Sequence, residues 1–124
     1  MKFRRKPVVI EAAQWFRNGD HPKDNCPVFQ RPTGPGGEMF DYPGEGEVVR
    51  YFRHPVVAGD AICRDCGRTM HDHGWIDSAN TLNPSGCTVC PGDWVLTEMS
   101  DPTKYYPCKP GTFADTYEAV SDPV

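Results

Sequence analysis

Apolar residues along this chain fall into short runs, and the clearest runs have the composition or alternation of β-strands. Residues 8–16 begin with β-branched and apolar side chains and end in Trp15 and Phe16, one of which we expect to anchor a strand buried on one face. Residues 47–53 place apolar and polar side chains on alternate faces, which predicts a second strand. The remaining strand candidates are shorter, at residues 75–76, 88–89, 94–97, 105–106 and 117–120.

Turn residues separate these runs. Gly59 and Asp60 stand between two apolar pairs and predict a hairpin-type turn. Residues 90–93 read Cys-Pro-Gly-Asp, a tight turn in which proline fixes φ and glycine supplies a positive φ. Pro110 suits a first helical position and predicts one helical turn at residues 110–114. We therefore expect an α+β fold that is predominantly β, a small barrel or curled antiparallel sheet with short helical turns.

Residues 17–46 have a different composition, with a proline or glycine every few positions. Such a density allows no helix and no central strand, so we expect one long loop, of the kind that is usually functional or mobile.

The whole chain of 124 residues fits a single domain, but only 38% of it is hydrophobic. A metal clip that contributes several kcal/mol would then matter for folding.

Two Cys-x-x-Cys pairs are the strongest chemical signal. Twenty residues separate the pair Cys63 and Cys66 from the pair Cys87 and Cys90, a spacing typical of four-thiolate zinc sites. Each pair can deliver two thiolates to one tetrahedral Zn²⁺ ion. Gly67, directly after Cys66, favours a tight turn there, because such a turn often needs a positive φ. We therefore expect a zinc-binding hairpin over residues 63–90, with a structural Zn²⁺ held by all four cysteines.

His71 and His73 offer alternative ligands. A His-x-His pair on a strand points both rings to the same side, so either ring could replace one cysteine and give a three-cysteine, one-histidine site. A catalytic zinc with three protein ligands and a bound water is the third interpretation. Two solvated loop histidines outside the site are the ordinary alternative.

Enzyme motifs are weak. Zinc deaminases pair His-x-Glu with Pro-Cys-x-x-Cys, whereas this chain reads His71-Asp72-His73, with an aspartate but no glutamate, and has Gly86 in place of the proline. A zinc-dependent hydrolase or deaminase is therefore an alternative that we do not favour. Cys108 lies beside Lys109, but a buried structural role is expected for it, and Cys26 has no local activating group.

The charge distribution argues against a general nucleic-acid-binding role. Four of the thirteen basic residues are Lys2, Arg4, Arg5 and Lys6. The remaining nine against seventeen acidic residues leave a net charge of −8 over residues 7–124. Binding of nucleic acid through the basic N-terminal residues, with help from Arg50 and Arg53, is therefore an alternative only.

The start of the chain does not resemble a secretion signal. Its basic residues lead into a short apolar run that ends at Glu11, and no other run is long enough to span a bilayer. We expect a cytoplasmic protein in which the six cysteines are metal ligands and free thiols, with disulfides as the alternative.

Aromatic and basic residues suggest a ligand site. Most aromatic side chains are needed for the core, but a subset could line a pocket for a planar or anionic ligand. The candidates are Arg50, Arg53, Trp75, Trp94 and Lys109.

Several segments resemble a family of small uncharacterised proteins of tailed bacteriophages and prophages, notably those of actinobacteria. They are residues 1–12 (MKFRRKPVVIEA), 73–77 (HGWID), 90–95 (CPGDWV), 106–110 (YPCKP) and 113–118 (FADTYE). Together they cover about half of the chain. The chain has Gly111 and Thr112 where members of that family often have Asp-Ile.

The resemblance implies a phage setting in the cytoplasm of an infected cell. Some members of the family have the Pro-Gly-Asp-Trp segment without the two cysteine pairs, which implies that zinc stabilises a local extension and is not the shared activity. The expected function is that of a non-enzymatic accessory protein that binds a host protein or a small ligand, for example to block host defence or to modulate host machinery.

Overall fold

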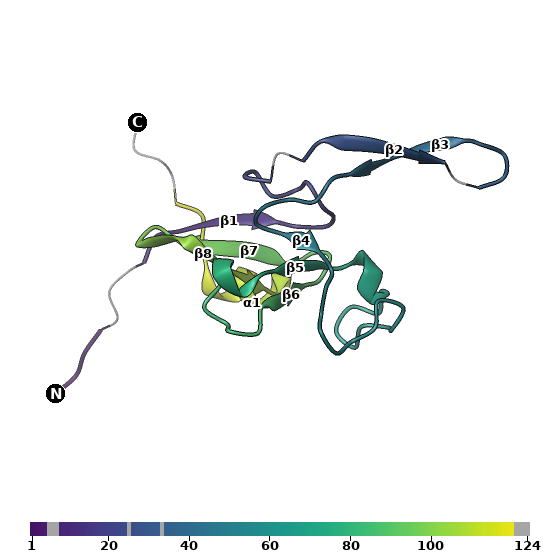
Figure 1. The fold of residues 1–124 in the computed structure, drawn as a ribbon. Coiled ribbons are helices and arrows are strands. Elements are labelled where there is room, and N and C mark those ends of the chain that lie inside the picture. The colour runs from purple at the N-terminus through teal and green to yellow at the C-terminus, as the bar shows by residue number, and fades with distance from the viewer. Residues whose placement is uncertain (5–7, 25, 33, 121–124) are drawn as a thin grey trace.

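The computed structural model describes residues 1–4, 8–24, 26–32 and 34–120. Over these residues the chain forms three small antiparallel sheets, one α-helix and two short 3₁₀ helices (Figure 1). The first sheet has the order β1–β7–β8 and the second the order β4–β5–β6, while β2 and β3 form a hairpin. The strands are β1 Ile10–Gln14, β2 Val28–Pro32, β3 Met39–Pro43, β4 Arg50–Tyr51, β5 Gly74–Ile76, β6 Cys87–Val89, β7 Trp94–Glu98 and β8 Asp101–Cys108. The helices are η1 Met70–Asp72, η2 Ser78–Asn80 and α1 Pro110–Thr116.

The first sheet joins the two ends of the sequence. β1 pairs with β7 along its whole length, from Ile10 opposite Glu98 to Gln14 opposite Trp94. β7 and β8 follow one another in the chain and pair with a register irregularity between Leu96 and Glu98. The strands predicted near residues 8–16, 94–97 and 105–106 are therefore confirmed.

The main core is built from apolar side chains of both three-stranded sheets and the segments that flank them. Trp15 is its largest member and is 1% exposed, whereas Phe16 is 54% exposed, so Trp15 is the anchor of the first strand. The Trp15 backbone accepts a hydrogen bond from Gly92 N–H at 2.6 Å and donates one to Asp93 O at 2.8 Å. These bonds fasten the end of β1 to the turn before β7. The other core residues are Val48, Val49, Ile76, Val89, Val95 and Tyr105.

The second sheet contains the predicted hairpin arms, since β5 and β6 pair antiparallel from Gly74 opposite Val89 to Ile76 opposite Cys87. β4 is only two residues long, although residues 47–53 were expected to form a strand. The buried carboxylate of Asp24 accepts the N–H groups of Val48 at 2.7 Å and Val49 at 3.3 Å. The Asp24 carboxylate thus supplies the hydrogen-bond acceptors that a neighbouring strand would supply to these two residues. Pairing of β4 with β5 begins only at Arg50.

The prediction of one long loop over residues 17–46 is corrected by the β2–β3 hairpin, which extends away from the rest of the molecule (Figure 1). All five residues of β2 are exposed. An exposed two-stranded hairpin has no central strand, and it tolerates Pro32 at a strand end because no interior ladder bond is lost. The proline and glycine density therefore excluded a buried strand and not an exposed one.

Two other expectations change, and one is confirmed. The hairpin expected around Gly59 forms no strands, and only an isolated bridge joins Ile62 to Thr69. Residues 117–120 form no strand, whereas α1 begins at Pro110 as predicted and is held by stacking of Phe113 on Trp94, with ring centroids 4.2 Å apart.

The predominantly β class is confirmed, but the sheets in the described part of the chain stay open and form no closed barrel. None of the helices in the described residues has both the length and the apolar character needed to cross a bilayer.

Candidate metal centre

Four potential ligand residues come together between the 52–73 segment and the turn after β6. The ligand atoms of Cys63, Cys66, His73 and Cys90 all lie within 4.8 Å of one another. The sulfurs of Cys63 and Cys90 are 3.8 Å apart, and Nε2 of His73 is 3.2 Å from the sulfur of Cys66. Sulfurs bound to a tetrahedral Zn²⁺ at about 2.3 Å would be about 3.8 Å apart. The group therefore has the size of a site for a single metal ion.

The first cysteine pair occupies a tight turn. The N–H of Gly67 donates to Cys63 O at 2.9 Å, and the N–H of Cys63 donates to Arg68 O at 2.8 Å. Gly67 has φ +75°, a conformation that favours glycine and was expected directly after the second cysteine. Such a turn brings both sulfurs to the same side.

The same turn stabilises a thiolate at Cys63. Burial by itself raises the pKa of this thiol. The backbone N–H groups of Cys66 and Asp65, followed by side-chain interactions with His73 and Cys66, more than offset the burial and lower the pKa of Cys63 to about 7. The thiolate is the form that binds a metal.

His73 is buried, with 2% of its surface exposed, at the entrance to β5. Its Nδ1–H donates to the carbonyl oxygen of Thr69 at 2.9 Å. This bond fixes the tautomer and leaves the lone pair of Nε2 free to bind a metal, the usual outer-sphere arrangement of a histidine ligand. The 3₁₀ turn η1 positions the ring, because the N–H of His73 donates to Met70 O at 3.0 Å.

Cys90 is the buried cysteine of the group and lies beside two charged side chains. Its N–H donates to Oδ2 of the buried Asp93 at 2.9 Å, and Nζ of Lys109 lies 3.3 Å from Oδ1 of the same carboxylate. Burial raises the pKa of the Cys90 thiol, and a hydrogen bond from Lys109 opposes this rise. Three thiolates and one Zn²⁺ carry a net negative charge, which the nearby ammonium of Lys109 would offset.

Cys87 lies outside the group, although it was one of the four expected ligands. It is part of β6, opposite Ile76, and its sulfur is 3.5 Å from Oγ1 of Thr81. In an extended strand, residues three positions apart point to opposite faces. Cys87 and Cys90 therefore diverge, and the structure places the alternate ligand His73 where the fourth cysteine was expected.

His71 also lies away from the group. Its N–H donates to Gly59 O at 2.8 Å, and its ring packs so closely on Gly59 that a Cβ there would be 2.3 Å from the ring. The expectation that both histidines point the same way holds only on a strand. Residues 70–72 form a 3₁₀ turn instead, which separates the two rings.

The residues proposed for a planar or anionic ligand do not form one pocket. Arg50 forms salt bridges with Glu45 at 3.2 Å and Asp77 at 3.3 Å, and Arg53 pairs with the same Glu45. The other three candidates lie in separate places. Trp75 is buried in the core, Trp94 stacks on Phe113, and Lys109 lies beside the metal centre.

The remaining candidates have ordinary environments. Lys2 and Arg4 are exposed, while Arg5 and Lys6 lie outside the described residues. Cys26 and Cys108 are both half-buried, and burial raises the pKa of each thiol, which is the opposite of activation. Asp93 was not foreseen, although its place three residues after Cys90 in a turn sequence is the local signal for it.

No protein-family model, no curated protein and no solved structure matches this chain. Its candidate function must therefore be inferred from the metal centre and from the rest of the surface.

Proposed function

We propose that this protein is a non-enzymatic binding protein whose fold is stabilised by a structural Zn²⁺ ion. The observation that carries the proposal is the grouping of Cys63, Cys66, His73 and Cys90 within the dimensions of one tetrahedral ion. Three thiolates with one imidazole are a common ligand set for structural zinc.

The number of protein ligands supports a structural role over a catalytic one. Catalytic zinc keeps one position for water or substrate and is bound by three protein groups. Here four protein atoms are available, which fills a tetrahedral shell. The ordered Nδ1–H bond of His73 and the N–H bonds to Cys63 are features of a site that is built to hold its ion.

The position of the site explains what the ion would do. Residues 52–73 contain only η1 and one isolated bridge, and they supply three of the four ligands. Cys90 comes from the turn that leads into β7. A bound ion would therefore hold a segment with little regular structure against the two sheets, so that its binding free energy contributes to folding.

The binding role is proposed for a phage accessory protein acting in the infected cell, with a host protein or a small ligand as its target. Support for the phage setting comes from the resemblance of both ends and of the cysteine region to phage proteins. The net charge of −8 over residues 7–124 speaks against nucleic acid as the main target.

Elemental analysis of the purified protein tests the metal proposal, with one zinc per chain as the expected result. Metal loss to a strong chelator should lower the thermal midpoint and expose residues 52–73 to hydrogen exchange before the β1–β7–β8 sheet. A protein that holds no metal, or that hydrolyses a substrate through a zinc-bound water, would contradict the proposal. Affinity capture from host lysate, with a Cys90→Ser variant as the control, tests the binding role.

A further inference from the structure

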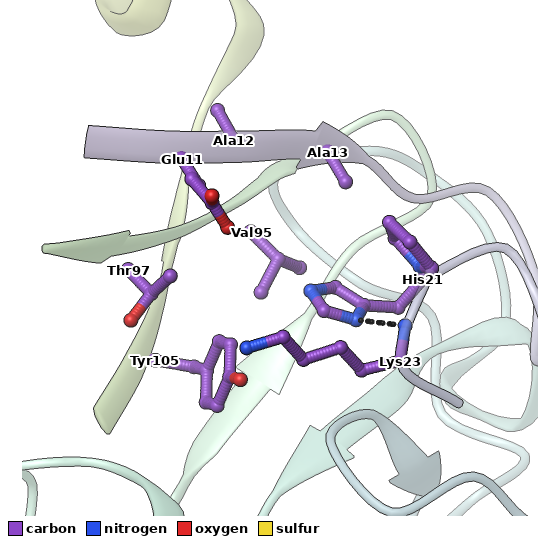
Figure 2. A pocket seen from close by; sticks show the side chains of 9 residues that line it. Glu11, Ala12, Ala13, His21, Lys23, Val95, Thr97 and Tyr105 are labelled. Carbon is purple, nitrogen blue, oxygen red and sulfur yellow. Dashed lines mark hydrogen bonds between the residues drawn. The ribbon is translucent and has the colours of Figure 1, made fainter. Parts of the chain in front are cut away.

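A second feature of the molecule lies apart from the metal centre and shares no residue with it. A cavity of about 340 Å³ opens between the β1–β7–β8 sheet and residues 21–23 (Figure 2). This volume is in the range of sites for small organic molecules. The wall formed by the sheet is apolar there because Ala13 and Val95 contribute only small side chains to it, whereas the side chain of Ala12 points to the other side of β1 (Figure 2).

His21 presents an unused polar group to this cavity. The residue is 6% exposed, and its Nδ1 accepts the N–H of Lys23 at 3.2 Å, so that in the neutral ring the proton is on Nε2. Figure 2 shows the second ring nitrogen directed into the cavity. Among the described residues, no protein group forms a hydrogen bond with it, and the edge-on contact with Tyr105, 5.4 Å between centroids, holds the ring in place.

Lys23 adds a positive charge at the mouth of the same cavity. Its Nζ lies 5.7 Å from the centroid of the Tyr105 ring, and it forms no salt bridge with any acidic group in the described part of the chain. Figure 2 shows the lysine side chain stretched across the cavity toward Tyr105. An ammonium without a carboxylate partner, next to an unused imidazole N–H, is a pair of donors that suits an anionic group.

We propose that this cavity binds a small organic acid, with the carboxylate between His21 Nε2–H and the Lys23 ammonium and the apolar part of the ligand on Ala13 and Val95. Glu11 also lines the cavity and would repel an anion from its end, which orients the acid toward His21 and Lys23. This inference deepens the proposed binding role and rests on it, because it names the class of ligand.

Titration of the zinc-loaded full chain with sodium benzoate tests the inference, with amide chemical shifts as the readout. We expect saturable shifts at residues 11–13, 21–23 and 95–97, and binding that is at least about fivefold tighter than that of benzyl alcohol or benzylamine. Lys23→Gln should weaken benzoate binding about fivefold. Lys23 is exposed, so the substitution removes its charge and its contact with the Tyr105 ring without opening a void in the core. Lys2→Gln makes the same charge change on the exposed N-terminal segment and should leave the affinity unchanged.

Three outcomes would overturn the inference: no saturation by about 20 mM benzoate, equal binding of the neutral or cationic probe, or an affinity that Lys23→Gln does not alter. Zinc is measured in the same samples. Full zinc with no acid binding would refute the acid site alone, whereas acid binding with little zinc would refute the metal proposal alone.

Discussion

The second Cys-x-x-Cys pair provides the sharpest test of the metal centre, because its two cysteines have opposite expected roles. Cys90 is grouped with the other ligands, while Cys87 faces Thr81 from β6. Cys87→Ser and Cys90→Ser are the same chemical change three residues apart, so each variant serves as the matched control of the other.

The size of the effect follows from the linkage between binding and folding. Free zinc at about 100 times its dissociation constant stabilises the folded state by about 2.7 kcal/mol. The unfolding entropy of 124 residues is about 0.26 kcal/mol/K, so loss of the ion should lower the thermal midpoint by about 10 °C. Cys90→Ser should show this loss. Cys87→Ser removes only a half-buried sulfur and should cost below about 1 kcal/mol, or about 4 °C.

The assay combines zinc content after desalting with a thermal melt at fixed free zinc, and Co²⁺ substitution reports the number of thiolates by charge-transfer absorbance. Cys87→Ser should keep one metal per chain and the wild-type cobalt spectrum. Cys90→Ser should bind metal weakly and lose one thiolate from the spectrum. If Cys87→Ser releases the metal, or if Cys90→Ser keeps both the metal and the spectrum, the ligand set inferred from the structure is wrong.

Three further substitutions probe the fold around the two sites. Gly74→Ala places a Cβ 2.3 Å from a core methyl group and should destabilise the protein by about 1–3 kcal/mol, as measured by calorimetry. Asp24→Asn weakens the carboxylate bonds at the entrance to β4 and should lower the free energy of unfolding in urea by about 1.5–3 kcal/mol without loss of metal. Burial lowers the pKa of His21, and the charge of Lys23 adds to this effect, against the opposite influence of Asp24 and Glu11. The unfolded state therefore takes up a proton below about pH 6.5 that the folded state does not, and stability falls as the pH drops through that range. His21→Gln should make this fall shallower in urea titrations between about pH 7 and pH 5, and an unchanged slope would contradict it.

The sequence predicted the first half of the metal centre better than the second. Gly67 after Cys66 indicated a tight turn, and a tight turn is what brings those two sulfurs together. Thr88 and Val89 indicated a strand, and the strand formed. These two predictions were incompatible at the second pair, because an extended Cys-x-x-Cys cannot present both sulfurs to one ion. The β-branched residues inside the pair were the signal that favoured His73 over Cys87.

Long-range contacts account for most of what the sequence did not reveal. The role of Asp24 depends on backbone groups more than twenty residues away, and the cavity beside His21 depends on where residues 21–23 lie over the first sheet. Neither feature has a local pattern. The exposed β2–β3 hairpin was missed for a different reason, since proline and glycine content reports what cannot be buried and not what can pair in solvent.

The pairing of β1 with β7 has a consequence for how the chain acquires its structure. More than eighty residues separate Ile10 from its partner Glu98, so this ladder closes a very long loop and cannot form on a nascent chain until the C-terminal part has left the ribosome. Until then Trp15 has no turn to dock on, and the first strand is an apolar segment open to aggregation. Because β1 is synthesised long before its partner β7, the first sheet is completed late. We expect any dependence on chaperones to arise from the time that β1 is exposed before β7 becomes available.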